Sequence, residues 1–226
     1  RDRLRSRGLG DVYKRQIFGS QFNANWSEIL LMFNAQSFGT TDPQFGLDNG
    51  FYVFVLPGLK LVLAAVAMLL GVGLVFSVVT HVLMGGIRIT MPVNGRGLFS
   101  ITKRCRRQLG IWLMLNMFAW AVRQMIGVFD QLTVQGSRIT GASYTAVHAN
   151  IPVTFIMAAL TAILGVVLGI WLMRSHTLEG QASIGVRASA ALKAWRVPVT
   201  SIAVVVVVGL VLTVAWPVLL QGFRVN

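Results

Sequence analysis

Residues 61–83 of the chain read LVLAAVAMLLGVGLVFSVVTHVL, an apolar run of 23 residues without Asp, Glu, Lys or Arg. A helix needs about 20 such residues to cross a hydrocarbon core of roughly 30 Å. Three further runs of this kind follow, at residues 109–129, 151–173 and 199–220. Since an open strand edge has no hydrogen-bonding partner in lipid, we expect each run to be a membrane-spanning helix.

The composition of the chain supports the same fold class. Of its 226 residues, 55% are hydrophobic and 12% are charged, whereas soluble domains average roughly 45–50% and about 25%. This excludes an ordinary soluble domain. The single cysteine, Cys105, excludes a disulfide framework and a Cys-based zinc site. We therefore predict an all-α fold, a polytopic helical membrane protein with four transmembrane helices, a short outer amphipathic helix and an ordered outer loop.

The first sixteen residues look foreign to the protein. Residues 11–16, DVYKRQ, can be encoded by the end of a transposase-type sequencing adapter, and the preceding residues 6–10 fit the rest of it. We therefore exclude residues 1–16 from the fold, as is proper for a non-native segment. Removing their six basic and two acidic residues lowers the formal net charge from +13 to +9.

The remaining basic residues lie in two of the connections between the apolar runs. These connections, residues 85–108 and 174–198, hold ten basic residues: Arg88, Arg96, Lys103, Arg104, Arg106, Arg107, Arg174, Arg187, Lys193 and Arg196. Cytoplasmic loops carry the excess of Lys and Arg in membrane proteins. We expect both connections to be cytoplasmic, so that residues 17–58, 130–150 and 221–226 are extracytoplasmic.

A short helix is expected before the first span. Asn25 and Glu28 have the spacing of a capping box, and apolar residues recur at helical spacing from Trp26 to Phe33. The segment is too short to cross a membrane. It is either an interfacial helix with Trp26 among the headgroups or the end of a longer upstream membrane helix.

Several motifs of the chain are long enough to be compared with known families. The longest is FGTTDPQFGLDNGFYVFVLP at residues 38–57. Others follow: HVLMGGIRI at 81–89, RQLG at 107–110, TGASYT at 140–145 and AWP at 215–217. In sequence and order these motifs resemble those of a bacterial family of large multi-pass membrane proteins, uncharacterised protein family 0182, and the resemblance covers residues 26–225.

The resemblance implies an architecture and not an activity. Family members have about seven membrane helices followed by a large extracytoplasmic region, so the four spans would be the last four of seven. The chain then divides into an extracytoplasmic segment with the motif loop (17–58), a helical membrane domain (59–220) and the start of an extracytoplasmic region (221–226). The helices and the extracytoplasmic domain that the chain lacks are expected partners.

The loop before the first span holds the main candidate site, because it combines two carboxylates with turn-forming and aromatic residues. Its candidate residues are Asp42, Pro43, Gln44, Phe45, Gly46, Asp48, Gly50, Phe51 and Tyr52. Asp-Pro and Asn-Gly pairs favour turns in which Asx side chains bond nearby backbone, so we expect a structural role. The alternative is a hard-cation site, although the spacing of an EF-hand is absent.

Three polar residues lie within the apolar runs. Arg123 costs roughly 3 kcal/mol at a helix centre on insertion scales, and it is expected either to reach the outer headgroups or to line a transport path. Asn116 is expected to bond between helices. His81 lies at the inner end of the first span, where a proton relay is the less favoured alternative because the runs contain no carboxylate.

The basic cluster Lys103, Arg104, Arg106 and Arg107 directly precedes the second run. A cluster in this position is typical of contact with anionic lipids at the cytoplasmic face. The bilayer and its anionic lipids, and not nucleic acid, are therefore the expected partners.

No catalytic motif is found in the sequence: there is no Walker loop, nucleophile elbow, HExxH or paired carboxylates. We therefore expect no cofactor, no metal and no catalytic residue. The favoured hypothesis is the membrane-anchoring part of an envelope protein in the bacterial plasma membrane. The alternative is a segment of a transporter or channel, which would use Arg123 and the intramembrane glycines. A membrane enzyme ranks third.

Overall fold

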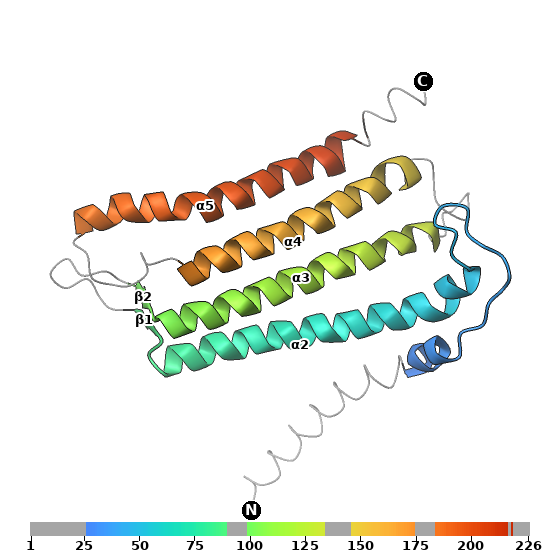
Figure 1. Cartoon of the computed structure of the whole chain (residues 1–226), viewed down its shortest axis with the longest axis horizontal. Coiled ribbons are helices and arrows are strands. Elements are labelled where there is room, and N and C mark those ends of the chain that lie inside the picture. Colours follow the sequence, from blue (N-terminus) through green and yellow to red (C-terminus); the bar gives the residue numbers. More distant parts are fainter. Residues whose placement is uncertain (1–25, 90–98, 134–145, 175–183, 217, 219–226) are drawn as a thin grey trace, which may run out of the picture. The chain divides into compact units, whose positions relative to one another are not determined.

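A computed structural model describes residues 26–89, 99–133, 146–174, 184–216 and 218. The chain forms two compact units, residues 1–63 and 64–226, which are described separately. The segment at 1–16, the connection at 134–145 and the end at 221–226 lie outside the described residues. Figure 1 shows the order of the elements along the chain.

The first unit contains a helix at residues 26–33, a loop, the π-helical turn η1 (Phe51–Val55) and the beginning of α2 (Leu56–Leu83). The helix packs closely against the start of α2. A Cβ atom on Gly58 would lie 2.8 Å from Cβ of Met32 and 2.9 Å from the carbonyl oxygen of Glu28. Only glycine therefore allows the two helices this approach.

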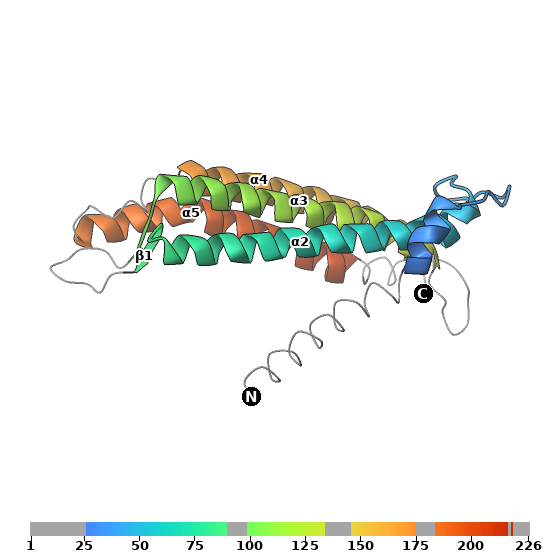
Figure 2. The same cartoon turned by 90° about the horizontal axis from the view of Figure 1, so that it is seen from below.

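The second unit contains the rest of α2, followed by α3 (Lys103–Thr133), the π-helical turn η2 (Ala146–Asn150), α4 (Ile151–Arg174), α5 (Ile184–Leu210) and the turn η4 (Val211–Ala215). Within this unit α3 packs against both α2 and α4, and α4 contacts α5. The view in Figure 2 shows the same neighbours from a second direction.

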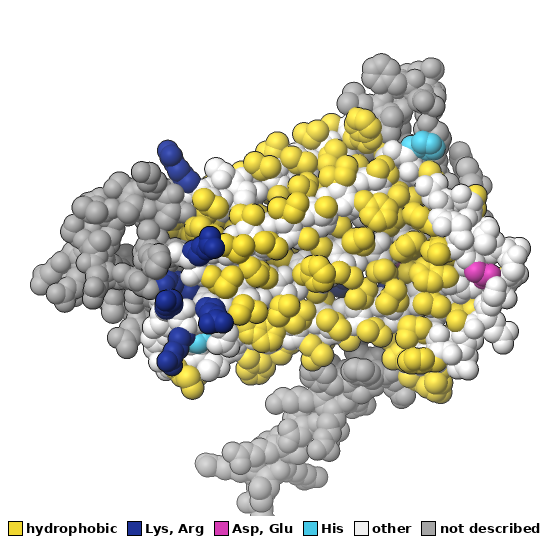
Figure 3. Space-filling model, in the orientation of Figure 1, with side chains coloured by type: hydrophobic (Ala, Val, Ile, Leu, Met, Phe, Trp, Pro, Cys, Tyr) yellow, Lys and Arg dark blue, Asp and Glu magenta, His cyan; other side chains and the backbone are white. Residues whose placement is uncertain are grey.

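Four helical stretches are long and apolar enough to cross a membrane: Phe51–Leu83, Lys103–Thr133, Val147–Arg174 and Trp195–Ala215. The prediction of an all-α, four-helix membrane fold is thus confirmed. Large apolar side chains are exposed along all four, as Figure 3 shows for one face.

Two helices extend beyond the apolar runs, which the sequence did not predict. The helix α3 begins at Lys103, six residues before the apolar run that starts at residue 109, so the end of the expected cytoplasmic connection is helical. The helix α5 begins at Ile184, and Pro198 lies inside it instead of before it. Two hydroxyls just after this proline bond to carbonyl oxygens of their own helix, Thr200 to Arg196 (2.6 Å) and Ser201 to Pro198 (3.0 Å).

A small antiparallel ribbon, which was not expected from the sequence, joins α2 to α3. Strand β1 (Ile87–Ile89) pairs with β2 (Phe99–Ile101), with Ile87 opposite Ile101. Ile101 packs with Cys105 and Leu109 in a buried cluster that Leu74, Ile87 and Leu172 border. The ribbon therefore closes one end of the helical unit with apolar contacts.

Glycines set the spacing of the helices in the second unit. A Cβ on Gly73 of α2 would lie 2.5 Å from the Trp112 ring of α3. Gly110 of α3 and Gly169 of α4 face each other so closely that a Cβ on either would lie 2.9–3.0 Å from the other's carbonyl oxygen. Small residues at such positions are what allow helix backbones to approach in lipid.

Candidate functional site

Asp48 is the centre of the loop that precedes α2. Its carboxylate accepts hydrogen bonds from the Ser37 hydroxyl and from the backbone N–H groups of Gly50 (2.7 Å), Phe38 (2.9 Å) and Gly39 (3.0 Å). The Ser37 bond, then those from Phe38 and Gly50, lower the pKa of Asp48 from 3.8 to about 2, because all of them stabilise the charged form. The carboxylate thus holds together two parts of the loop ten residues apart.

Asp42 forms the second anchor of the loop. Its Oδ2 accepts bonds from the Phe45 N–H (2.7 Å) and the Tyr52 hydroxyl (3.2 Å), and its own N–H donates to the Leu47 carbonyl (2.8 Å). Gly46, with φ +67°, occupies the left-handed region that the turn requires. The turn between the two aspartates is therefore closed by its own backbone.

Further bonds join the two sides of this loop. Thr41 and Asp48 form an isolated antiparallel bridge, and Asn49 donates to Thr40 through both its backbone (2.9 Å) and its side chain (3.0 Å). The ring of Phe38 meets that of Phe54 edge-on at 5.5 Å. We call residues 36–54 the carboxylate-anchored loop.

The geometry of this loop fits a structural role better than a cation site. Both oxygens of Asp48 and Oδ2 of Asp42 already accept bonds from the loop itself. Among the described residues no group of three His, Cys, Asp or Glu side chains could hold a metal ion. Of the other candidate residues, Pro43 and Gln44 are exposed at the turn. The rings of Phe51 and Tyr52 meet edge-on, with their centroids 5.4 Å apart.

Polar side chains within the helical unit bond from one helix to the next. The Asn116 amide donates to the Leu70 carbonyl of α2 (3.2 Å) and to Trp112 of its own helix (2.8 Å). His81 of α2 lies 3.0 Å from the Gln108 side chain of α3. Two glutamines that were not singled out from the sequence, Gln124 and Gln131, donate to Thr161 and Thr154 of α4, each at 3.2 Å.

The basic cluster is divided by the structure. Lys103, Arg104 and Arg107 are exposed, but Arg106 is only 1% exposed, so the expectation that it faces lipid is wrong. The reason is helical phase: Arg106 lies on the face of α3 that also carries the buried Cys105, Leu109 and Gly110. If the helix is assumed to start at Lys103, its 3.6-residue period already places Arg106 on the same face as Leu109 and Gly110 and so predicts its burial.

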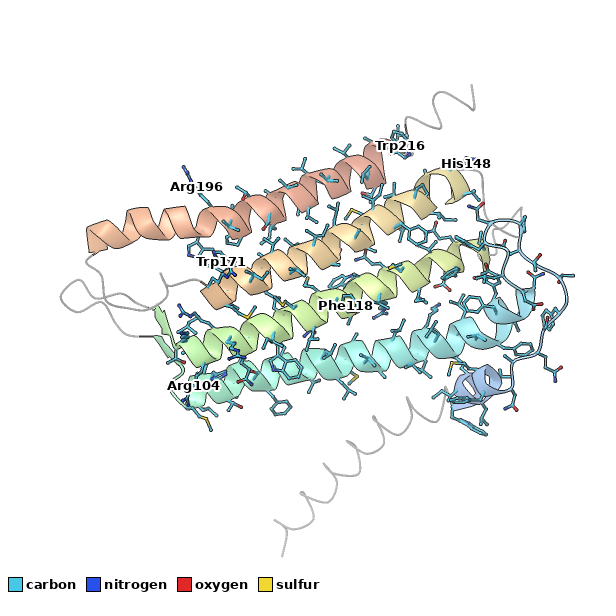
Figure 4. The ribbon with its side chains drawn as sticks, in the orientation of Figure 1. Arg104, Phe118, His148, Trp171, Arg196 and Trp216 are labelled. Atoms are coloured by element: carbon cyan, nitrogen blue, oxygen red, sulfur yellow. The ribbon has the colours of Figure 1, made fainter. Side chains whose placement is uncertain are left out.

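Basic side chains gather at one end of the second unit, where α3 begins and α4 ends. Figure 3 shows Lys and Arg side chains gathered at this end of the unit. Arg174, the last residue of α4, and Arg196 of α5 are exposed, like the three residues of α3. Figure 4 places Arg104 and Arg196 at this end and His148 and Trp216 at the other. We call the exposed residues Lys103, Arg104, Arg107, Arg174 and Arg196 the basic end.

Four apolar helices with an ordered polar loop before the first of them define a polytopic helical membrane protein. The profile of a family described as "Uncharacterised protein family (UPF0182)" matches residues 11–226, and the chain belongs to this family. The match begins at residue 11 and therefore includes the last six residues of the segment 1–16 that was expected to be foreign.

Curated relatives carry the same family name. The UPF0182 protein of Bifidobacterium adolescentis is 77% identical over 210 residues, which are 93% of this chain and 19% of that protein. The proteins of Kocuria rhizophila (33% identity, 93% of this chain) and Corynebacterium glutamicum (30%, 89%) match 19% of their own lengths. The chain thus spans about a fifth of these relatives. No solved structure matches it.

Proposed function

We propose that this chain is the membrane-anchoring helical part of a bacterial plasma-membrane protein with a large extracytoplasmic portion. The observation that carries the proposal is the separation of side chains along the helices. The basic end lies where α3 begins and α4 ends, and large apolar side chains cover the length of the unit beyond it. By the positive-inside rule this end faces the cytoplasm.

The proposed topology gives each end of the unit a partner. At the basic end, Lys103, Arg104 and Arg107 are positioned to contact anionic lipid headgroups, which attract cations next to a membrane span. The carboxylate-anchored loop, which precedes the opposite end of α2, is then extracytoplasmic. Because relatives are about five times longer than the matched region, most of the protein that these helices would hold lies outside this chain.

The alternative of a transporter segment finds less support in the described residues. In a transporter, glycines would be expected beside a cavity or at a break in a helix. Here side chains of the neighbouring helix pack directly against three of them: Trp112 against Gly73, Met117 against Gly165, and Met114 against Gly169. These contacts fit close packing of continuous helices.

The test of this proposal is cysteine accessibility in the full-length protein. Cys105 is fully buried, so it serves poorly as a reporter and is first replaced by alanine. Single cysteines at the exposed positions Lys103 and Gln44 are then treated with a membrane-impermeant maleimide. Gln44→Cys should react in intact cells, and Lys103→Cys only in inverted vesicles.

The opposite pattern would reverse the orientation, and reaction of both cysteines from one side would show that the helices do not anchor as proposed. A protease site inserted after Asn226 of the full-length protein tests the anchoring role itself. Cleavage from outside should release the downstream portion into solution. Retention of that portion on the membrane would contradict the anchoring function.

A further inference from the structure

Two tryptophans mark a level along the helices near the basic end. Trp171 of α4 and Trp195 of α5 lie against each other, with ring centroids 5.4 Å apart, and Trp195 is 50% exposed. Tryptophan is enriched where lipid headgroups meet the hydrocarbon core of a bilayer. In the proposed topology, this pair therefore lies at the cytoplasmic interface.

The same level can be traced on α3. A Cβ atom on Gly110 would lie 2.9 Å from the carbonyl oxygen of Gly169 and 2.7 Å from Cγ of Met173, so Gly110 is level with the tryptophan of α4 between them. The two helices run antiparallel, since Met117 of α3 packs against Gly165 of α4 farther along. Residues before Gly110 therefore lie beyond the tryptophans, on the side away from the apolar spans.

Three arginines, one from each of these helices, lie close to this level. Arg107 and Arg174 are each three residues beyond it, which is about 4.5 Å toward the cytoplasm. Arg196 is within one residue of it, and a long arginine side chain can extend to the same depth. All three are exposed, and Figure 4 shows Arg196 on the side of α5 that points away from α4. We call Arg107, Arg174 and Arg196 the arginine arc.

The arginine arc has no carboxylate beside it among the described residues of the second unit. The one Asp or Glu among them is Asp130, which lies 23 residues, or about 35 Å, along α3 from Arg107. Lys103 and Arg104 are cations as well and lie farther out, about 9–10 Å past the level of the tryptophans. Arg123 is also exposed, but it is 16 residues, or about 24 Å, from Arg107 and takes no part in the arc.

We propose that the arginine arc binds the phosphate groups of anionic phospholipids in the cytoplasmic leaflet, with Trp171 and Trp195 against the apolar part of the same lipids. The headgroup layer on each side of a bilayer is about 5–8 Å thick, so the arc lies at the depth of the phosphates. Guanidinium groups pair with phosphate through two parallel hydrogen bonds. The proposal rests on the proposed function in requiring that the basic end lies at a bilayer surface.

Lipid binding to the full-length protein in detergent tests the site. A fluorescent phosphatidylglycerol is titrated in about 0.5 M NaCl, which screens charges that do not touch the lipid. Arg174→Gln/Arg196→Gln should weaken binding about tenfold. The matched control, Lys103→Gln/Arg104→Gln, removes the same charge from exposed positions and should weaken binding less than about threefold. Arg174→Lys/Arg196→Lys keeps the charge without the fork of donors and should give an intermediate affinity.

Equal weakening by the two glutamine variants would overturn the proposal, because it would show a diffuse attraction between charges. Wild-type affinity in the lysine variant would also overturn it, and this variant keeps the charge on which the fold could depend. Equal binding of phosphatidylcholine, or displacement of the lipid by inorganic phosphate at the same concentration, would do the same. The first would show that the anionic headgroup is not selected, and the second that the tryptophans add nothing.

The cysteine assay described above keeps this result separate from the proposed function. The titration in detergent does not depend on which side of a membrane the basic end faces. If Lys103→Cys reacts only in inverted vesicles but the two glutamine variants bind lipid alike, the arginine arc fails and the topology stands. If Lys103→Cys reacts in intact cells, the proposed topology fails whatever the titration gives.

Discussion

The carboxylate-anchored loop and the contact between α3 and α4 are ordered by different forces. In the loop, backbone N–H groups that have no carbonyl partner donate to the carboxylates of Asp48 and Asp42 instead. Most residues of the loop are exposed. Between α3 and α4, Gly110 and Gly169 bring two backbones together with methionine side chains around them. Order in the water-exposed loop thus depends on hydrogen bonds, whereas order between the apolar helices depends on the shape of the packed surfaces.

The largest effect is expected where shape decides. Gly169→Leu places a branched side chain against the Gly110 carbonyl oxygen, which belongs to the backbone and cannot rotate away. We expect a loss of about 3 kcal/mol in the free energy of unfolding, at the upper end for overpacking. Unfolding in mixed detergent measures it. Ala159→Leu, on the exposed side of the same helix, is the control; equal stability of the two variants would contradict this account.

A smaller and local effect is expected in the loop. Asp48→Asn replaces a charged acceptor with an amide whose NH₂ group opposes the N–H donors of Phe38, Gly39 and Gly50. Hydrogen exchange at those three amides should accelerate, with little change in α3 and α4. Gln44→Ala, at an exposed turn position, should leave exchange unchanged, so equal acceleration in both variants would argue against Asp48 as the anchor.

The same carboxylate gives the loop a dependence on pH. The folded pKa of Asp48 is about 2 and its ordinary value is 3.8. A lowered pKa means that its stabilisation is complete above pH 3.8 and is lost as the pH falls toward 2. Exchange of the loop amides, corrected for intrinsic rates, should be constant from pH 7 to about 5 and rise below about 4. Asp48→Asn should abolish this rise; its persistence would assign the titration to another group.

The smallest effect is expected for the polar bonds between α3 and α4. Gln124 and Thr161 should show a coupling of about 0.6 kcal/mol in a double-mutant cycle with Gln124→Leu and Thr161→Val, the usual value for such bonds in membrane proteins. Detergent unfolding of the four proteins measures it. A coupling above about 2 kcal/mol would mean that hydrogen bonds rival shape in this contact.

The sequence predicted the helical membrane fold because long apolar runs admit few other structures in lipid. It did not predict the helix ends, since Lys103 to Gln108 look like a charged loop until their helical phase is considered. The ribbon was missed although Ile87, Arg88 and Ile89 alternate in the manner of a strand. Both errors come from treating charge as a sign of irregular structure.

The loop shows a similar division between local and distant contacts. Asp42-Pro43 predicted the turn that follows Asp42, because this preference acts within a few residues. The tight turn expected at Asn49-Gly50 is wrong, since these residues are helical, with φ −60° and ψ −29° at Gly50. The bond from Ser37 to Asp48 joins residues eleven apart, and no local pattern indicates it. The partners Thr161 and Thr154 of the overlooked glutamines depend likewise on how α3 packs against α4.

The lengths of the helices have a consequence for the membranes that can hold them. The 31 residues of α3 measure about 46 Å, and the helical stretch Phe51–Leu83, with 33 residues, about 50 Å. A hydrocarbon core of roughly 30 Å is shorter than either, even with a tilt of about 40°. Several turns of each helix therefore extend past the acyl chains. If the bilayer becomes a few ångströms thicker or thinner, the boundary of its hydrocarbon core still falls on residues that are already helical. Such an assembly tolerates hydrophobic mismatch without refolding its ends.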